Sequence, residues 1–119
     1  MSVKEWGEPM PRTLPEPTVD SIDLTVVLSA LADPARRALM AALYDGPEPI
    51  DCALLNERLD LGLSNPTISH HYRVLREAGL TRTVAEGRKR IIRVRRDDME
   101  ARFPGLLKAV LEPELARTP

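Results

Sequence analysis

The chain has 119 residues and a mass of 13.3 kDa, which is enough for one domain whose core needs neither a disulfide nor a metal. Hydrophobic residues make up 43% of it and charged residues 29%, as in an ordinary globular protein, and the single cysteine, Cys52, excludes an internal disulfide. The net charge is −1, no apolar stretch approaches the ~20 residues that span a bilayer, and the N-terminus lacks the apolar run of a secretory signal. We therefore expect a cytoplasmic protein without membrane contact.

Residues 1–19 are expected to form a proline-rich N-terminal arm. Prolines at positions 9, 11, 15 and 17 disfavour a helix or a central strand there, and apolar residues are too sparse for a core. Two roles stay open for Trp6: an anchor on the body or on a partner chain, and a stray aromatic side chain in the tail. At the other end, residues 113–119 are expected to form a C-terminal tail.

Residues 20–112 carry the patterns of a folded domain. A helix-spaced apolar stripe begins near residue 20, and Asp33-Pro34 is a typical start of a second helix, with a capping carboxylate before a proline in the first turn. Asp51 is a candidate cap for a third helix, and Gly62 lies in the short turn that follows it.

A fourth helix is expected over residues 64–78, capped by Ser64 or Asn65 and ended by Gly79. Two β-type runs follow it and predict a hairpin with one solvated face. The predicted fold is mainly α with a small β-hairpin wing, a winged helix-turn-helix in the order α-α-α-α-β-β-α.

The last helix of this fold is expected to begin at Asp97 or Asp98 and to continue to about residue 112. The pair Pro104-Gly105 must kink or split it, because proline and glycine both disfavour a helix interior.

Basic residues gather in the part of the chain that holds the fourth helix and the hairpin. Residues 64–96 contain nine basic and two acidic residues, a net charge of +7, and the rest of the chain carries −8. Such a separation within one domain suggests a surface that meets a polyanion such as DNA. A charge run that only faces solvent remains the alternative.

Two motifs in this chain match a known pattern. Residues 64–80 read S-N-P-T-I-S-H-H-Y-R-V-L-R-E-A-G-L and residues 31–36 read L-A-D-P-A-R. They resemble the recognition helix, S-x-x-T-[VI]-S-x-H-[LY]-x-x-L-x-x-A-G-L, and the upstream L-A-D-P-x-R of ArsR-type (arsenic-repressor-like) winged-helix regulators, over about residues 22–112. The resemblance implies a homodimeric transcriptional regulator, here taken as a repressor, that binds an inverted-repeat operator through a recognition helix at 64–78 and a wing at 81–96.

The fourth helix offers one face to the core and the opposite face to DNA. Ile68, Tyr72 and Leu75 repeat at helical spacing and are expected to face inward. The opposite side offers hydroxyl, amide, imidazole and guanidinium groups that bond to bases or phosphates. We expect DNA contacts from the following residues of the helix and of the hairpin tip: Ser64, Asn65, Thr67, Ser69, His70, His71, Arg73, Arg76, Arg88, Lys89 and Arg90.

Structural roles stay open for three of these residues. Ser64 also caps the helix, and Arg73 is alternatively an exposed helix charge. His71 lies close to the buried flank, so a packed or hydrogen-bonded position suits it at least as well as DNA. A metal site on His70 and His71 is not expected, because neighbouring side chains on a helix point about 100° apart.

The resemblance also implies that the first and last helices pair across a two-fold axis, which would set two recognition helices about 34 Å apart. The candidate dimer contacts are Ile22, Val26, Phe103, Leu107 and Leu111. The alternative is that these residues complete the core of the monomer.

The metal ligands of many relatives do not carry over to this chain. Cys52 stands alone where the metal-binding pattern has a Cys-x-Cys pair, and the last helix has no histidine, so we expect no metal and no cofactor. Cys52 is either a thiol sensor that makes the regulator redox-responsive or, more commonly for a lone cysteine, a small core residue. Any small-molecule effector is unidentified.

Two other functional classes compete with DNA binding. Catalysis is not expected, because the sequence has no nucleophile elbow, paired general acid and base, or glycine-rich phosphate loop. The rival hypothesis is a winged-helix module that binds protein through its acidic arm and end helices. The +7 segment and the polar helix face favour DNA over this rival.

Overall fold

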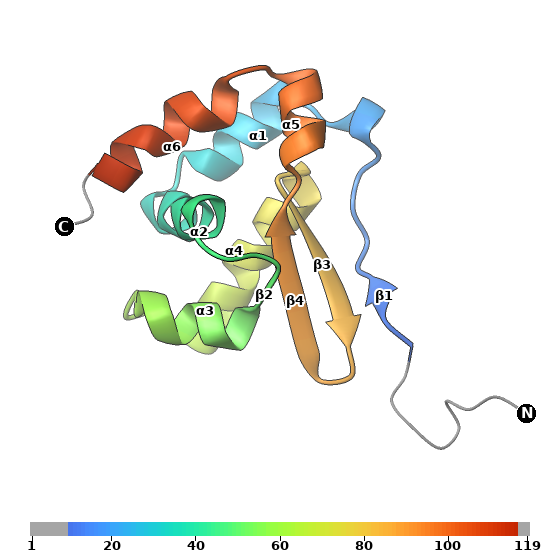
Figure 1. The fold of residues 1–119 in the computed structure, drawn as a ribbon, viewed down its shortest axis with the longest axis vertical. Coiled ribbons are helices and arrows are strands. Elements are labelled where there is room, and N and C mark those ends of the chain that lie inside the picture. The colour runs from blue at the N-terminus through green and yellow to red at the C-terminus, as the bar shows by residue number, and fades with distance from the viewer. Residues whose placement is uncertain (1–9, 117–119) are drawn as a thin grey trace, which may run out of the picture.

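The computed structural model of the chain describes residues 10–116. Six α-helices and four short strands make up this part of the chain, so the predicted mainly α fold with a hairpin wing is confirmed (Figure 1). The elements are β1 (Arg12–Thr13), the 3-10 helix η2 (Val19–Ser21), α1 (Leu24–Leu31), α2 (Pro34–Asp45), β2 (Ile50–Asp51), α3 (Cys52–Leu59), α4 (Asn65–Ala78), β3 (Thr81–Glu86), β4 (Lys89–Val94), α5 (Arg96–Arg102) and α6 (Leu106–Ala116). Trp6 lies outside the described residues.

The helix starts that the capping residues predicted are observed. The carboxylate of Asp33 accepts hydrogen bonds from the backbone N–H groups of Ala35 and Arg36, at 2.8 and 3.2 Å, at the start of α2. Asp51 caps α3 and Ser64 caps α4 in the same way. Gly79 ends α4 with φ of 91°, a left-handed conformation that favours glycine.

The last predicted helix is split rather than kinked. α5 and α6 are separate helices, and Gly105 adopts φ of 81° between them. Arg95, not Asp97 or Asp98, occupies the position before α5. α6 continues through Pro113 to Ala116, so the prediction that residues 113–119 form a tail is wrong for the first four of them.

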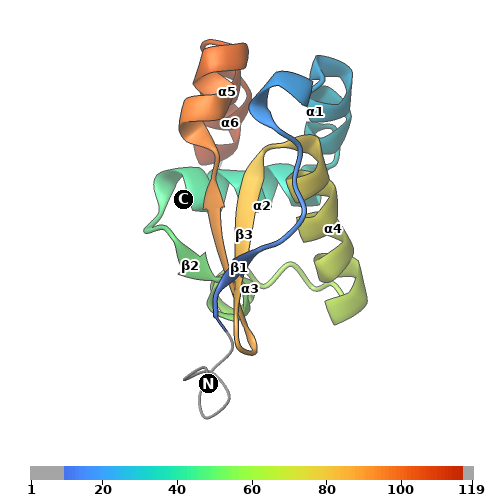
Figure 2. The ribbon, with the colours of Figure 1, turned by 90° about the vertical axis from the view of Figure 1, so that its right-hand side faces the viewer.

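The wing is broader than the predicted hairpin. β3 and β4 pair from Thr81 opposite Val94 to Glu86 opposite Lys89, and two further strands extend the sheet in the order β1-β3-β4-β2 (Figure 2). Within the segment predicted to be a proline-rich arm, Arg12 and Thr13 of β1 thus form an edge strand of the sheet. Neither β1 nor β2 could be read from the sequence, because two residues are too few to show an alternating pattern.

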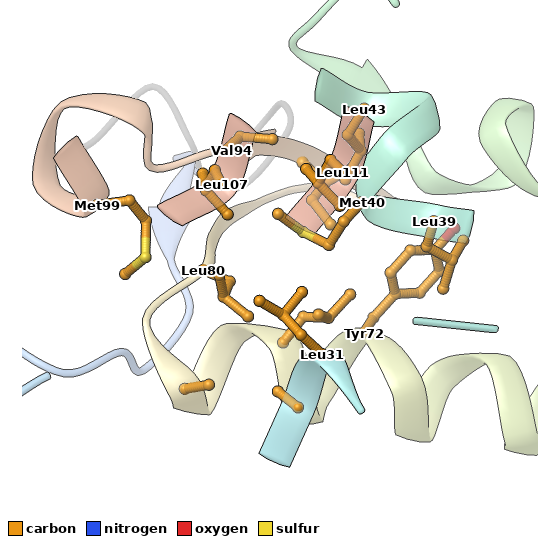
Figure 3. Packing of buried hydrophobic residues seen from close by; sticks show 14 of the residues in the cluster. Leu31, Leu39, Met40, Leu43, Tyr72, Leu80, Val94, Met99, Leu107 and Leu111 are labelled. Atoms are coloured by element: carbon orange, nitrogen blue, oxygen red, sulfur yellow. The ribbon is translucent and has the colours of Figure 1, made fainter. Parts of the chain in front are cut away.

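The core is aliphatic and joins all the α-helices to the inner face of the sheet. Figure 3 shows side chains from α2, α4 and α6 meeting in one cluster. Its fully buried large members are Val27, Leu39, Met40, Leu43, Leu75, Leu80, Ile92, Val94, Met99 and Leu111. Each such side chain contributes about 1.5–3 kcal/mol relative to leaving it in water.

The elements of the sequence-predicted DNA surface lie at one end of the molecule. In Figures 1 and 2, α1, α5 and α6 gather at the opposite end, whereas the hairpin turn and the first residues of α4 point the same way. The N-terminal segment runs beside β3 and reaches the same end as the hairpin turn.

Candidate nucleic-acid interface

α4 has the two faces that its sequence predicted. Ile68, Tyr72 and Leu75 are buried against the core. The residues exposed to solvent include six of the predicted DNA contacts, namely Ser64, Asn65, Thr67, Ser69, His70 and Arg73. These positions start at the helix N-terminus, where the helix dipole favours an anion such as a phosphate.

α3 and α4 are held together by a hydrogen bond that the sequence did not indicate. The hydroxyl of Tyr72 donates to the side-chain oxygen of Asn56 and lies 3.5 Å from the backbone oxygen of Cys52. Burial, with the nearby Cys52 and Asp51, raises the pKa of the Tyr72 hydroxyl, so it remains a donor at neutral pH. This contact links the two helices of the helix-turn-helix to each other.

Ser64 combines capping with exposure. Its hydroxyl accepts a hydrogen bond from the backbone N–H of Thr67 at 3.3 Å and lies 2.9 Å from the Thr67 hydroxyl. The capping alternative for Ser64 therefore holds. The hydroxyl pair remains exposed at the tip of α4.

Arg73 and His70 form a pair on the exposed face. Nη2 of Arg73 lies 3.3 Å from Nδ1 of His70, one helical turn apart. A guanidinium can only donate, so Nδ1 accepts and the proton of a neutral His70 ring is on Nε2. The pair presents two neighbouring donors to the solvent, which suits the acceptors N7 and O6 of guanine or a phosphate.

His71 points the other way, and its assignment as a DNA contact is wrong. The residue is 7% exposed, and its Nδ1 lies 3.2 Å from Nη1 of Arg36 in α2. Nε of Arg36 also donates to the backbone oxygen of Ala30 at 2.6 Å, so the three residues join α4 to the end of α1 and the start of α2. The hydrogen-bonded alternative for His71 holds.

Arg76 lies on the flank of α4 that faces the N-terminal segment. Its Nε donates to the backbone oxygen of Pro15 at 3.1 Å, and the residue is half-buried. This contact with a segment 61 residues away was not expected from helical spacing. It occupies a group that we had assigned to DNA.

At the hairpin tip, Arg88, Lys89 and Arg90 are exposed as predicted. Nη1 of Arg90 lies 3.1 Å from the backbone oxygen of Lys89 and 3.4 Å from that of Gly87, so its side chain folds back over the turn. Arg88 and Lys89 are therefore the more available cations of the tip.

Some of the basic residues in 64–96 are neutralised by carboxylates from outside that segment. The ion pairs are Arg82 with Glu16 at 2.6 Å, Arg95 with Asp98 at 2.9 Å and Arg96 with Glu48 at 3.2 Å. Arg95 is only 5% exposed, so most of its side chain is shielded from solvent. The +7 of the segment thus exceeds the charge that it offers to DNA, which comes mainly from five exposed residues: Arg73, Arg88, Lys89, Arg90 and Arg93.

Three of the five proposed dimer contacts belong to the core of the monomer. Ile22, Leu107 and Leu111 are 2%, 7% and 0% exposed, so they are wrong as contacts with a partner chain. Val26 is 46% exposed, and Phe103 is half-buried beneath the guanidinium of Arg102, 5.3 Å from its ring centre. Leu24 and Leu28 of α1, at 43% and 46%, are exposed apolar residues that the sequence analysis did not single out.

Cys52 lies in the first turn of α3, partly buried. Burial, with the charge of Asp51 next to it, raises the pKa of the Cys52 thiol to about 12. A thiol with such a pKa has almost no reactive thiolate at neutral pH, which weakens the thiol-sensor alternative.

Among residues 10–116, no three His, Cys, Asp or Glu side chains gather in a group that could hold a metal ion. None of the helices within that range is long and apolar enough to cross a membrane.

Comparison with known proteins identifies the family. Residues 31–84 match the model of a family described as a helix-turn-helix domain. The chain is also 31% identical over 84 residues to the uncharacterized HTH-type transcriptional regulator YceK of Bacillus subtilis (strain 168), which covers 71% of this chain and 82% of that protein. The chain belongs to the helix-turn-helix transcriptional regulators. As a member of this family it is a DNA-binding regulator.

The matched segment of this helix-turn-helix regulator is smaller than its folded body. It runs from the last residue of α1 through α4 and into β3. The hairpin tip, β4, α5, α6 and the whole segment before residue 31 lie outside it. The family match therefore says nothing about these surrounding elements, and their arrangement around α4 is known only from the structure.

Proposed function

We propose that this regulator is an ArsR-like repressor that binds an inverted-repeat operator as a homodimer. The observation that carries the proposal is that the first residues of α4 and the hairpin turn point to the same end of the molecule (Figure 2), and that Arg73 of α4 and Arg88 and Lys89 of the turn are exposed. In this arrangement α4 enters the major groove and the tip lies along the phosphates beside it. Repression follows from occupation of promoter DNA.

Homodimerisation is supported by the exposed apolar side chains of α1. Leu24, Val26 and Leu28 place three large apolar side chains in solvent on one eight-residue helix. α1 lies at the end of the molecule opposite the hairpin tip, so a two-fold axis there leaves both copies of α4 free to face one DNA duplex (Figure 1). Of the dimer contacts predicted from the sequence, Val26 is kept. Leu24 and Leu28 take the place of the predicted contacts that are buried in the core.

Fluorescence-anisotropy titration tests this proposal directly. Labelled DNA from the region upstream of the regulator's own coding sequence is titrated with protein at several salt concentrations, with scrambled DNA of equal length beside it. We expect preferential binding of the upstream DNA that weakens steeply with salt, because counterions are released from contacted phosphates. Binding without any salt dependence would reject the DNA interface, and the protein-binding alternative would take its place.

Two substitutions sharpen the titration. Arg73→Ala removes a donor pair from the proposed reading face and is expected to weaken specific binding by about tenfold, as loss of one bidentate base contact does. Lys108→Ala is the matched control, because it also removes one positive charge, from an exposed side chain of α6 at the far end of the molecule. If both variants lost the same affinity, net charge rather than the α4 face would account for binding.

A further inference from the structure

The N-terminal segment forms backbone and side-chain hydrogen bonds with the wing. We call residues 12–17 the N-terminal strap. Arg12 and Thr13 pair with Ala85 and Val84 as an edge strand of the sheet, and the backbone N–H of Leu14 donates to the backbone oxygen of Thr83 at 2.9 Å. The strap thereby turns the two-stranded hairpin into a three-stranded one on its β3 side.

Glu16 is the chemical centre of the strap. Its two carboxylate oxygens accept hydrogen bonds from Nε of Arg82, at 3.0 and 3.1 Å, and from Nη2 of Arg82 at 2.6 Å. Nη1 of Arg95 lies 3.5 Å from the same carboxylate. Because the Glu16 side chain is 15% exposed, this bidentate pair is partly shielded from water and is stronger than an ordinary surface ion pair.

Two backbone oxygens complete the attachment. The oxygen of Pro15 accepts from Nε of Arg76, in the last turn of α4, and the oxygen of Pro17 accepts from Nη1 of Arg95 at 2.9 Å. Prolines at 15 and 17 keep the strap extended. They have no N–H group to donate, so the hydrogen bonds that these two residues make to the arginines run through their backbone oxygens. Residues from the recognition helix, from β3 and from the end of β4 thus converge on three consecutive residues.

We propose that the N-terminal strap is a working part of the DNA-binding unit and that Glu16 is a positioning residue, which holds the wing at a fixed place relative to α4. This inference rests on the proposed DNA binding and deepens it. Without the strap, β3 would be an open edge of the sheet, so the added strand and the shared carboxylate reduce motion of the hairpin that binding would otherwise have to arrest. The strap lies outside residues 31–84, so the family match does not assign it.

The opposite role for Glu16 makes a different prediction. If the strap were an internal competitor of DNA, its carboxylate would occupy Arg82 and Arg95 in place of phosphates. Its removal would then free two cations, and DNA binding would become tighter and more dependent on salt. General electrostatics also predicts tighter binding, because the loss of any acidic residue near DNA reduces its repulsion of the phosphates. Positioning alone predicts weaker binding.

The decisive variant is Glu16→Gln, with Asp20→Asn as its control. Asp20 is an exposed acidic residue in η2, so the two substitutions change the charge equally and only Glu16→Gln breaks the arginine pair. We expect Glu16→Gln to bind the upstream DNA about three- to tenfold more weakly than wild type and to discriminate less against scrambled DNA, and Asp20→Asn to bind as wild type or slightly more tightly. Wild-type or tighter binding by Glu16→Gln, with a steeper salt dependence, would overturn the proposal in favour of competition.

A second variant and a measurement without DNA separate the possible failures. Leu14→Pro removes the N–H that pairs with Thr83 but leaves the charge unchanged, and it is expected to weaken binding in the same direction. Amide hydrogen exchange of the free protein should be faster in β3 and β4 for Glu16→Gln, with the exchange of core amides unchanged. If wild type binds no DNA, the proposed function fails. If wild type binds and both strap variants match it, only the strap inference fails.

Discussion

The turn between α4 and β3 offers a sharp test of the packing described above. Gly79 has φ of 91°, and a Cβ atom added to it would lie 2.7 and 2.8 Å from Cγ1 and Cδ1 of Ile22. Gly62, with φ of 67°, has no heavy atom within 4 Å of the same imaginary Cβ. Gly79→Ala therefore combines backbone strain with overcrowding, and Gly62→Ala is a control that has the strain alone.

The two substitutions should differ clearly in the free energy of unfolding. A left-handed conformation costs a non-glycine residue about 1–2 kcal/mol. Overpacking of a core adds about 1–3 kcal/mol, because Ile22 is 2% exposed and has little room to move. We expect Gly79→Ala to lose about 2–5 kcal/mol and Gly62→Ala about 1–2 kcal/mol. In a domain of this size the corresponding falls in Tm are about 8–20 °C and about 4–8 °C.

Thermal and urea unfolding followed by circular dichroism, at one protein concentration, measure both losses. Ile22→Ala in the Gly79→Ala background should cost less than the two single losses together, because it removes the atoms that the new methyl group meets. Equal losses for Gly79→Ala and Gly62→Ala would refute the reasoning. Ile22 would then not be packed against this turn, and its assignment to a dimer contact would be open again.

Two further predictions concern single ionisable groups. Partial burial alone would raise the pKa of Asp33, but the hydrogen bonds from Arg36 and Ala35 and the charges of Arg36 and His71 bring it below the ordinary 3.8. The charged carboxylate thus stabilises the folded state above pH 3.8 and loses this effect as the pH falls below it. In urea unfolding, the stability advantage of wild type over Asp33→Asn should therefore be present at pH 7 and disappear toward pH 2. A difference that stays constant with pH would contradict this prediction. Cys52, with its pKa raised to about 12 by burial and by Asp51, should hold about a thousandfold less thiolate at pH 7 than a thiol with the ordinary pKa of 9, and should therefore react with iodoacetamide much more slowly than such a thiol. Rapid modification of the folded protein, followed by mass spectrometry, would restore the thiol-sensor hypothesis.

Local chemistry explains which features could be predicted from the sequence. Asp33, Asp51 and Ser64 cap helices by bonding to amides two or three residues away, and Gly79 ends α4 through its own backbone freedom. These interactions need no distant partner, so the helix starts, the hairpin and the buried and exposed faces of α4 follow from the order of the residues. The solvent-facing candidates of α4 and of the hairpin tip were found for the same reason.

The errors in the candidate interfaces share a cause, which is that each depended on a partner distant in sequence. His71 is turned toward Arg36, 35 residues away, and Arg76 contacts Pro15, 61 residues away. Helical spacing tells which residues share a face but not which neighbouring element covers it, so Ile22, Leu107 and Leu111 were equally plausible as core and as dimer contacts.

The sequence by itself determined a winged helix-turn-helix with a polar recognition helix and a basic hairpin, because capping, periodicity and local charge are encoded in neighbouring residues. Only the tertiary structure decided how much of that charge is free and what frames the wing. Glu16, in a segment whose prolines suggested an arm, neutralises Arg82 from 66 residues away, and Arg12 and Thr13 of the same segment pair with β3. An ion pair depends on distance in space, and only the folded chain sets that distance.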